Sequence, residues 1–112
     1  MTAGDMRRAE IARLNDLFRS TGIGGEVFLT AGVAGLSASE LDEVVKAVRR
    51  FDRFTPDNDP YGEHDFASLV VGEHRIIWKI DYYPLEGVDH DPNSAVSKRC
   101  RRIMTIMLAE EY

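Results

Sequence analysis

Cysteine and long apolar runs are the scarcest features of this 112-residue chain. Cys100 is the single cysteine, so no intrachain disulfide can form, and a small secreted scaffold held together by disulfides is excluded. No segment approaches the roughly 18 apolar residues of a membrane-spanning helix. The two N-terminal arginines are not followed by the apolar run of a secretory signal. The sequence therefore predicts a cytoplasmic protein without a membrane segment.

The remaining composition is that of an ordinary globular protein. Hydrophobic residues make up 44% of the chain and charged residues 29%, a balance that excludes a disordered tail or a collagen-like repeat. The length is that of one domain, so residues 1–112 are expected to fold as a single unit. A domain of this size hides roughly two-thirds of the surface of its unfolded chain, so it needs no structural metal.

The formal net charge of −5 is unevenly distributed. Residues 1–54 are balanced, whereas residues 55–95 contain nine acidic and two basic residues. Basic residues follow in a short run, Lys98, Arg99, Arg101 and Arg102. A concentrated negative field attracts cations and basic protein surfaces and repels phosphate backbones. The pattern predicts a partner protein with a basic surface and disfavours direct nucleic-acid binding.

Helical periodicity is clear in two segments. Over residues 6–20, Ile11, Leu14, Leu17 and Phe18 share one face, and the charged residues, Arg19 included, are assigned to the solvent side. The glycines of residues 21–25 predict a helix end and a turn rather than a phosphate-binding loop, because no Lys-Ser/Thr pair follows them.

The second helix has a clear start signal. Ser37 and Glu40 form the pattern of a capping box, and Leu36 with Leu41 forms a hydrophobic staple. Apolar residues at helical spacing then continue, so this helix is expected to extend to about Phe54.

Four segments have strand character. Residues 26–31 are rich in β-formers, and residues 66–71 and 75–83 predict a hairpin across residues 72–74. In the second hairpin strand Trp78 is expected on the core face, and Lys79 with Asp81 on the accessible face. Residues 103–109 fit either a helix or a strand, and their β-branched residues favour a strand.

These elements predict an α+β fold in the order helix, strand, helix, strand, strand, strand. The simplest arrangement is an antiparallel sheet of about four strands with two helices packed on one face.

The candidate binding site is the acidic loop of residues 55–65 together with the accessible face of the second hairpin strand. Carboxylates and tyrosines occur together there, and tyrosine supplies rigid contact area with a polar tip, as in protein interfaces and mimics of nucleic acid. The candidate partner-binding residues are Asp57, Asp59, Tyr61, Glu63, His64, Asp65, Asp81 and Tyr83.

Metal binding and acid–base chemistry are alternative interpretations of the same residues. An EF-hand is excluded because Tyr61 and Ser68 occupy ligand positions five and twelve of the loop that would begin at Asp57. A less regular divalent-metal site, or proton transfer by His64 with Asp65 or Asp81, stays open. Cys100 is expected to be a buried or incidental thiol rather than a nucleophile.

Three motifs carry a resemblance to a known family. They are DNDPYGEHDF at residues 57–66, WKIDYY at residues 78–83 and TIMLAEEY at residues 105–112. With these motifs the chain, from Asn15 to its end, resembles a bacterial domain-of-unknown-function family, although Ala67 and Pro84 depart from its pattern. The resemblance implies a bacterial cytoplasmic protein often carried on plasmids or other mobile elements, where inhibitors of host defence, such as anti-CRISPR proteins, are expected. It implies no activity.

The sequence therefore leads to a primary functional hypothesis and two alternatives. The primary hypothesis is a small, acidic, non-catalytic protein that inhibits a nucleic-acid-processing or defence complex and needs no cofactor. The first alternative is a metal-dependent hydrolase that uses the cluster from Asp57 to Asp65, and the second is an antitoxin-like or self-associating module that pairs through a sheet edge.

Overall fold

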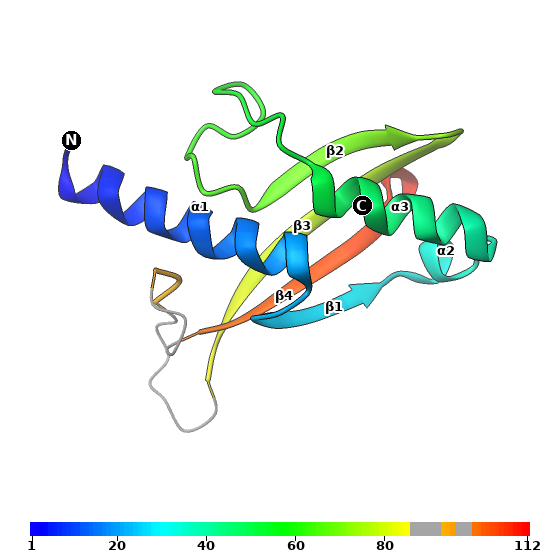
Figure 1. The fold of residues 1–112 in the computed structure, drawn as a ribbon, viewed down its shortest axis with the longest axis horizontal. Helices are drawn as coiled ribbons and strands as arrows, with labels where there is room; N and C mark the ends of the chain where they lie inside the picture. The colour runs from blue at the N-terminus through cyan, green and yellow to red at the C-terminus, as the bar shows by residue number, and fades with distance from the viewer. Residues whose placement is uncertain (86–92, 96–99) are drawn as a thin grey trace.

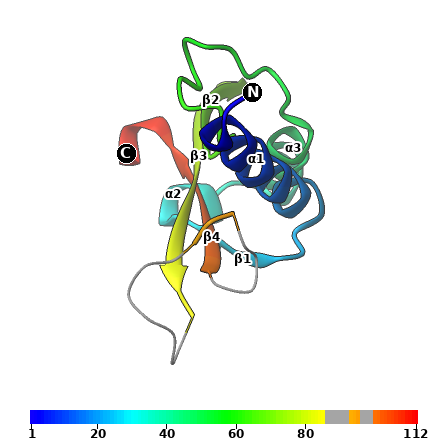
Figure 2. The same ribbon diagram turned by 90° about the vertical axis from the view of Figure 1, so that its left-hand side faces the viewer.

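The computed structural model describes residues 1–85, 93–95 and 100–112 as two layers (Figures 1 and 2). The helices α1 and α3 lie on the same side of a four-stranded sheet. The other face, called the open face, is covered by neither of these helices, and the ring of Tyr112 packs there against Phe66. The elements in chain order are α1 (Ala3–Thr21), β1 (Gly25–Leu29), α2 (Ala31–Ala34), α3 (Ala38–Arg50), β2 (Phe66–Val71), β3 (His74–Pro84), β4 (Cys100–Leu108) and the short 3₁₀ helix η1 (Ala109–Glu111).

The sheet is mixed, with the strand order β1-β4-β3-β2. The expected α+β class and four strands are confirmed, but the expectation of an antiparallel sheet is wrong for β1, which pairs in parallel with β4. The reason lies in the connection between β1 and β2. The chain leaves β1, crosses the helix-covered face through α3 and returns as β2 at the opposite edge, and such a crossover brings a strand back in the same direction.

The helices differ from the expectation at their ends and in their number. α1 begins at a capping box of Thr2 and Asp5, and the capping box of Ser37 and Glu40 is present at the start of α3. α3 ends at Arg50 rather than near Phe54, because Phe51 takes an extended conformation and its ring packs against Trp78. The short α2 occupies a segment where no helix was expected, so three α-helices occur among the described residues.

The core lies between the two helices and the inner face of the sheet. Ile76, Trp78 and Ile80 of β3 are buried there, which confirms the expected core face of that strand. The hairpin is confirmed, with Gly72 and Glu73 as its turn, and the last segment is the strand β4. On the open face of β3, Lys79 Nζ lies 2.9 Å from Asp81 Oδ2, and both side chains are about two-fifths exposed.

One expectation about the faces of α1 is wrong. Arg19 was assigned to the solvent side, but only 4% of it is exposed, whereas Leu17 on the expected apolar face is 52% exposed. The Arg19 guanidinium lies between aromatic rings, 5.2 Å from the centroid of Phe54 and 4.9 Å from that of Trp78. Aromatic faces attract a cation, so the core of this protein accepts a charge on the buried side of α1.

Candidate functional site

The acidic loop, residues 55–65, has its own hydrogen bonds. Asn58 Oδ1 accepts from the Thr55 backbone N–H at 2.8 Å, and its Nδ2 donates to the Arg53 carbonyl at 2.8 Å. The Asp59 N–H donates to the Thr55 carbonyl, also at 2.8 Å. Side chains of Asn and Thr that satisfy nearby backbone groups fix a turn locally. The loop predicted here is therefore held in one conformation.

A buried asparagine of α1 anchors the far end of the acidic loop. Asn15 is fully buried, and its Nδ2 donates to the Glu63 carbonyl at 3.0 Å and to the Tyr82 hydroxyl at 2.8 Å. Its Oδ1 accepts from Arg102 Nε at 2.7 Å. The Tyr82 hydroxyl lies 3.3 Å from Glu63 Oε1, and burial raises the pKa of Tyr82. These bonds tie α1, the acidic loop, β3 and β4 together.

His64 forms a second link between the acidic loop and α1. Its Nδ1 lies 2.9 Å from Asp16 Oδ2, its Nε2 lies 3.6 Å from Asp59 Oδ2, and its ring stacks on Phe54 with centroids 3.9 Å apart. The backbone of His64 has φ 55°, which a non-glycine residue adopts at a cost. Sequence analysis paired His64 with Asp65 or Asp81, whereas the structure pairs its ring with Asp16 and Asp59.

Asp65 carries the clearest electrostatic perturbation in the acidic loop. Burial raises the pKa of its carboxyl group above the usual value, and the nearby charge of Glu63 raises it further. The more distant carboxylates of Asp59 and Asp81 act in the same direction. Burial and neighbouring negative charges both favour the protonated form of a carboxyl group, so the raised pKa of Asp65 shows that acidic side chains lie close together at this end of the loop.

The structure divides the eight predicted binding residues into three groups. Asp57 and Tyr61 are exposed on the acidic loop, with 72% of Tyr61 accessible. Asp81 and Tyr83 lie on the open face of the sheet, where Asp81 pairs with Lys79. The remaining four, which are engaged within the fold or partly buried where the loop returns to β2, are Asp59, Glu63, His64 and Asp65.

The metal interpretation finds no donor set in the part of the chain that the structure describes. No group of three or more His, Cys, Asp or Glu side chains there is arranged to hold a metal ion. Within the acidic loop, His64 and Asp59 are turned toward each other, and Asp57 points to solvent as an exposed residue. The geometry therefore offers no observation in favour of the metal-dependent hydrolase.

The basic residues that follow the acidic stretch differ in exposure, because neighbouring residues of β4 point to opposite faces of the sheet. Arg102 is 2% exposed and lies over the Tyr82 ring, 5.4 Å from its centroid, so it is not available as part of a surface phosphate site. Arg101 is exposed, and Lys98 and Arg99 lie outside the described residues. Cys100 is buried, as expected, and burial raises the pKa of its thiol, which disfavours the nucleophilic thiolate.

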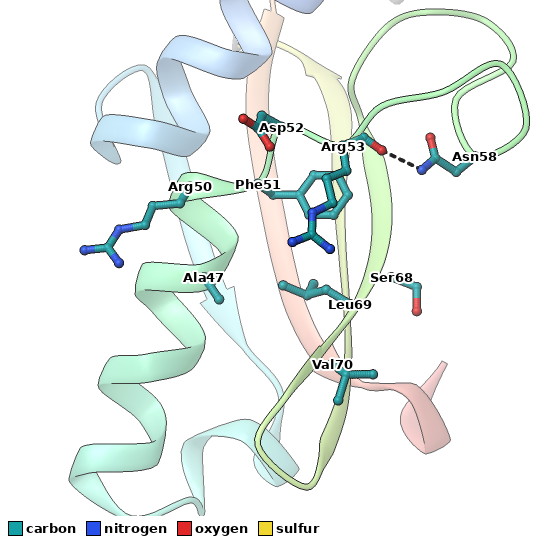
Figure 3. A pocket seen from close by; sticks show the side chains of 9 residues that line it. All are labelled: Ala47, Arg50, Phe51, Asp52, Arg53, Asn58, Ser68, Leu69 and Val70. Carbon is teal, nitrogen blue, oxygen red and sulfur yellow. Dashed lines mark hydrogen bonds between the residues drawn. The ribbon is translucent and has the colours of Figure 1, made fainter.

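Two cavities border the acidic loop. One, of about 480 Å³, lies between the loop and the start of α1 and is lined in part by Arg8, Tyr61 and His64. The other, of about 550 Å³, lies between the end of α3 and β2 (Figure 3). Figure 3 shows Asn58 bonded to the Arg53 backbone at its rim, whereas the Arg50 side chain extends away from Leu69 and Val70. None of the eight predicted binding residues lines this second cavity.

The eight predicted binding residues do not include the polar residues that hold the acidic loop in place, which are Asn15, Asp16, Tyr82 and Arg102. One signal for them exists in the sequence. Asn15 falls on the same helical face as Ile11 and Phe18, and a lone amide on an apolar stripe predicts a buried partner.

The structure defines a small two-layer α+β protein in which the loop of residues 55–65 exposes Asp57 and Tyr61. Residues 29–111 match the family described as protein of unknown function (DUF3768), and the chain belongs to that family. The expected resemblance to a domain-of-unknown-function family is thus confirmed, with a matched range that begins after α1. No curated protein and no solved structure matches the chain. Among the described helices, none is long and apolar enough to cross a membrane.

Proposed function

We propose that this protein is a non-catalytic binding protein of the bacterial cytoplasm whose acidic loop binds a basic surface of a partner protein. The observation that carries the proposal is the fixed conformation in which the loop exposes Asp57 and Tyr61. A nucleic-acid-processing or host-defence complex is the partner that offers such a basic surface, because the surfaces with which these complexes bind phosphate are basic. Occupation of that surface would inhibit the complex.

The rigidity of the acidic loop supports binding rather than a merely solvated turn. The hydrogen bonds of Asn58 and the anchor of Asn15 order the loop before any partner arrives. Binding then loses little conformational entropy, which is the main cost of ordering a flexible loop at an interface. Tyr61 offers a large apolar ring with a polar tip on a loop of fixed shape, as anchor residues of interfaces do.

The charges near Asp65 support a basic partner in particular. Glu63, Asp59 and Asp81 all raise the pKa of Asp65, so the free protein maintains an unfavourable concentration of negative charge. Such repulsion costs stability and is relieved when lysine or arginine side chains of a partner approach. Electrostatic steering by the same charges should make association fast at low salt and slower at high salt.

The proposal is tested by affinity capture from a bacterial host lysate, with the captured proteins quantified by mass spectrometry. We expect the double variant Asp57→Asn, Tyr61→Ser to lose the partner that the wild-type chain retains at low salt. Both residues are exposed, so the variant should fold normally. Glu73→Gln, which removes an exposed charge from the hairpin turn, is the matched control and should retain the partner. Equal capture by the double variant and the wild type would refute the assignment of this surface.

The pH dependence of binding provides a second prediction. A basic partner favours the charged form of Asp65, so it should lower the raised pKa of that carboxyl group and release a proton on binding. Affinity should therefore increase as the pH rises through the range in which free Asp65 titrates, above its usual value, and level off once Asp65 is ionised. Calorimetry in a pH series measures this, and Asp65→Asn should flatten the rise. A rise of the same size in that variant would contradict the role of Asp65.

A further inference from the structure

The strand β1 forms a free edge of the sheet, opposite the edge at which the acidic loop joins β2 (Figure 1). Its apolar side chains are unusually accessible, with 41% of Val27, 51% of Phe28 and 36% of Leu29 exposed. The Thr30 N–H donates to the Ile106 carbonyl, so residues 28 and 30 direct their backbone groups toward β4. Backbone groups alternate along a strand, so Val27 and Leu29 direct theirs outward. An apolar strand with free backbone groups is a template for an added strand.

An apolar cavity lies beside this edge, between β1 and α3. Its volume is about 240 Å³, and its apolar walls are formed by Val27, Leu29, Val45, Val48, Met104 and Ile106. Small-molecule sites occupy roughly 300–1,000 Å³, so this cavity is too small for a whole cofactor. It has the size and the lining that receive one aliphatic side chain.

Two arginines line the same cavity, and none of its described lining residues is acidic. Arg19 is 4% exposed, and its guanidinium is engaged within the fold, with Nη1 3.0 Å from Asp16 Oδ1 and Nη2 donating to the Phe51 carbonyl at 2.9 Å, so that only its Nε lacks a hydrogen-bond partner among the described residues. Arg49 is exposed and its guanidinium lies beside the glycine turn, because a Cβ built on Gly22 would come within 3.3 Å of its Nη2. The exposed Arg49 therefore supplies the cationic group at the mouth of an apolar cavity, and this combination fits a ligand that carries a carboxylate next to an apolar group.

We propose that the groove between β1 and α3 binds the carboxyl-terminal end of a partner polypeptide, added as a strand antiparallel to β1. A chain that ends in an apolar residue carries an apolar side chain and a carboxylate on one Cα, and the apolar cavity and the exposed Arg49 are complementary to these two groups. The direction follows from the position of Arg49 near Gly22, just before β1 begins. A chain that ends there and runs antiparallel to β1 pairs with Val27 and Leu29. This groove is separate from the acidic loop and would be a second binding surface of the protein.

The probes are two libraries of fluorescent hexapeptides with five randomised positions and a fixed terminal valine or leucine, one with a free carboxylate and one amidated. Peptides that bind the immobilised protein of residues 1–112 are retained and sequenced. The enriched peptide is then added to ¹⁵N-labelled protein, and its binding site is mapped from the amide signals that shift in NMR spectra. We expect enrichment from the carboxylate library only. The amide signals of Val27 and Leu29 and those of the glycine turn should shift on binding.

Two variants separate the contacts of the groove. Arg49→Gln removes the exposed guanidinium and should weaken the enriched peptide by about tenfold or more, as expected for loss of a charge-assisted hydrogen bond. Arg50→Gln removes the neighbouring arginine, which does not line this cavity, and should leave the affinity unchanged. Val27→Pro removes an outward N–H without disturbing the ladder to β4, and should also weaken binding. Thermal melting identifies any variant that fails to fold. The peptide affinities of the folded variants then test the proposal.

Several results would overturn the proposal. Equal enrichment from the amidated library, or no enrichment from either, would show that no chain terminus is recognised. The NMR signals of the cavity residues are also recorded with 3-methylbutanoate, a small carboxylic acid. If they shift as much as with the peptide, the cavity is a site for small carboxylic acids rather than for a chain terminus. A dimer in light scattering that Val27→Pro abolishes would assign the edge to a second copy of this chain. None of these results would affect capture through the acidic loop, which is measured with Asp57 and Tyr61.

Discussion

Replacing Asn15 with alanine is expected to lower the free energy of unfolding by about 3 kcal/mol. The substitution removes two donated bonds, to Glu63 and Tyr82, and the acceptor of Arg102 Nε. Arg102 is 2% exposed, so its guanidinium would lose a partner that water cannot replace. Loss of a partner from a buried charge costs far more than loss of a surface hydrogen bond. Chemical denaturation with urea measures the change.

The control for this prediction is Ser20→Ala on the same helix. Ser20 is exposed and its hydroxyl donates only to a carbonyl of its own helix, at 3.3 Å. Its replacement should change the free energy of unfolding by no more than about 0.5 kcal/mol. If Asn15→Ala proved as mild as this control, the described network would not hold the acidic loop against α1. Limited proteolysis of Asn15→Ala should also show cleavage within residues 55–65, because the loop loses its anchor.

Replacing Gly25 with alanine is the second substitution with a large expected effect, a loss of about 3 kcal/mol. A Cβ at this position would lie 2.5 Å from the Arg102 carbonyl oxygen and 2.7 Å from Phe18 Cζ. The carbonyl belongs to the backbone of β4 and cannot rotate away, so β1 must move from its partner strand. Thermal unfolding followed by circular dichroism measures the loss.

Gly4→Ala is the matched control for Gly25→Ala. Its added Cβ would have its nearest neighbour at 3.7 Å, an ordinary contact, and the residue lies in the first turn of α1. Alanine has a higher helix propensity than glycine, so this variant should be as stable as the wild type or slightly more stable. A Gly25→Ala protein with wild-type stability would mean that β1 and β4 approach less closely than described.

Local signals in the sequence predicted the local parts of the fold. The capping box of Ser37 and Glu40 and the hairpin of residues 66–83 depend on residues close together in the chain, and both are present, although the turn is one residue shorter than the expected residues 72–74. The alternation of β3 placed Trp78 in the core for the same reason. The parallel pairing of β1 was missed because it depends on β4, whose register places Arg102 beside Gly25. No property of residues 25–29 alone distinguishes a parallel from an antiparallel partner.

The candidate site was predicted in part. Sequence analysis located the acidic loop and its exposed residues Asp57 and Tyr61, because a run of Asp, Asn, Pro and Gly predicts an accessible turn. It placed Arg19 in solvent, since a charged residue on a helix is usually exposed. The rings that surround Arg19 come from Phe54 and Trp78, distant in sequence, so only the tertiary structure reveals that the charge is buried.

The pairing of β1 with β4 has a consequence for the order in which the chain folds. Thr30 bonds to Ile106, a residue 76 positions later. A contact of such sequence separation requires closure of a long loop, which slows its formation. During synthesis, the apolar edge of β1 therefore stays without its partner strand until the last strand has been made. The segment that carries the proposed docking groove is then a site of aggregation risk in every chain that lacks β4, and β4 must be synthesised before the groove exists.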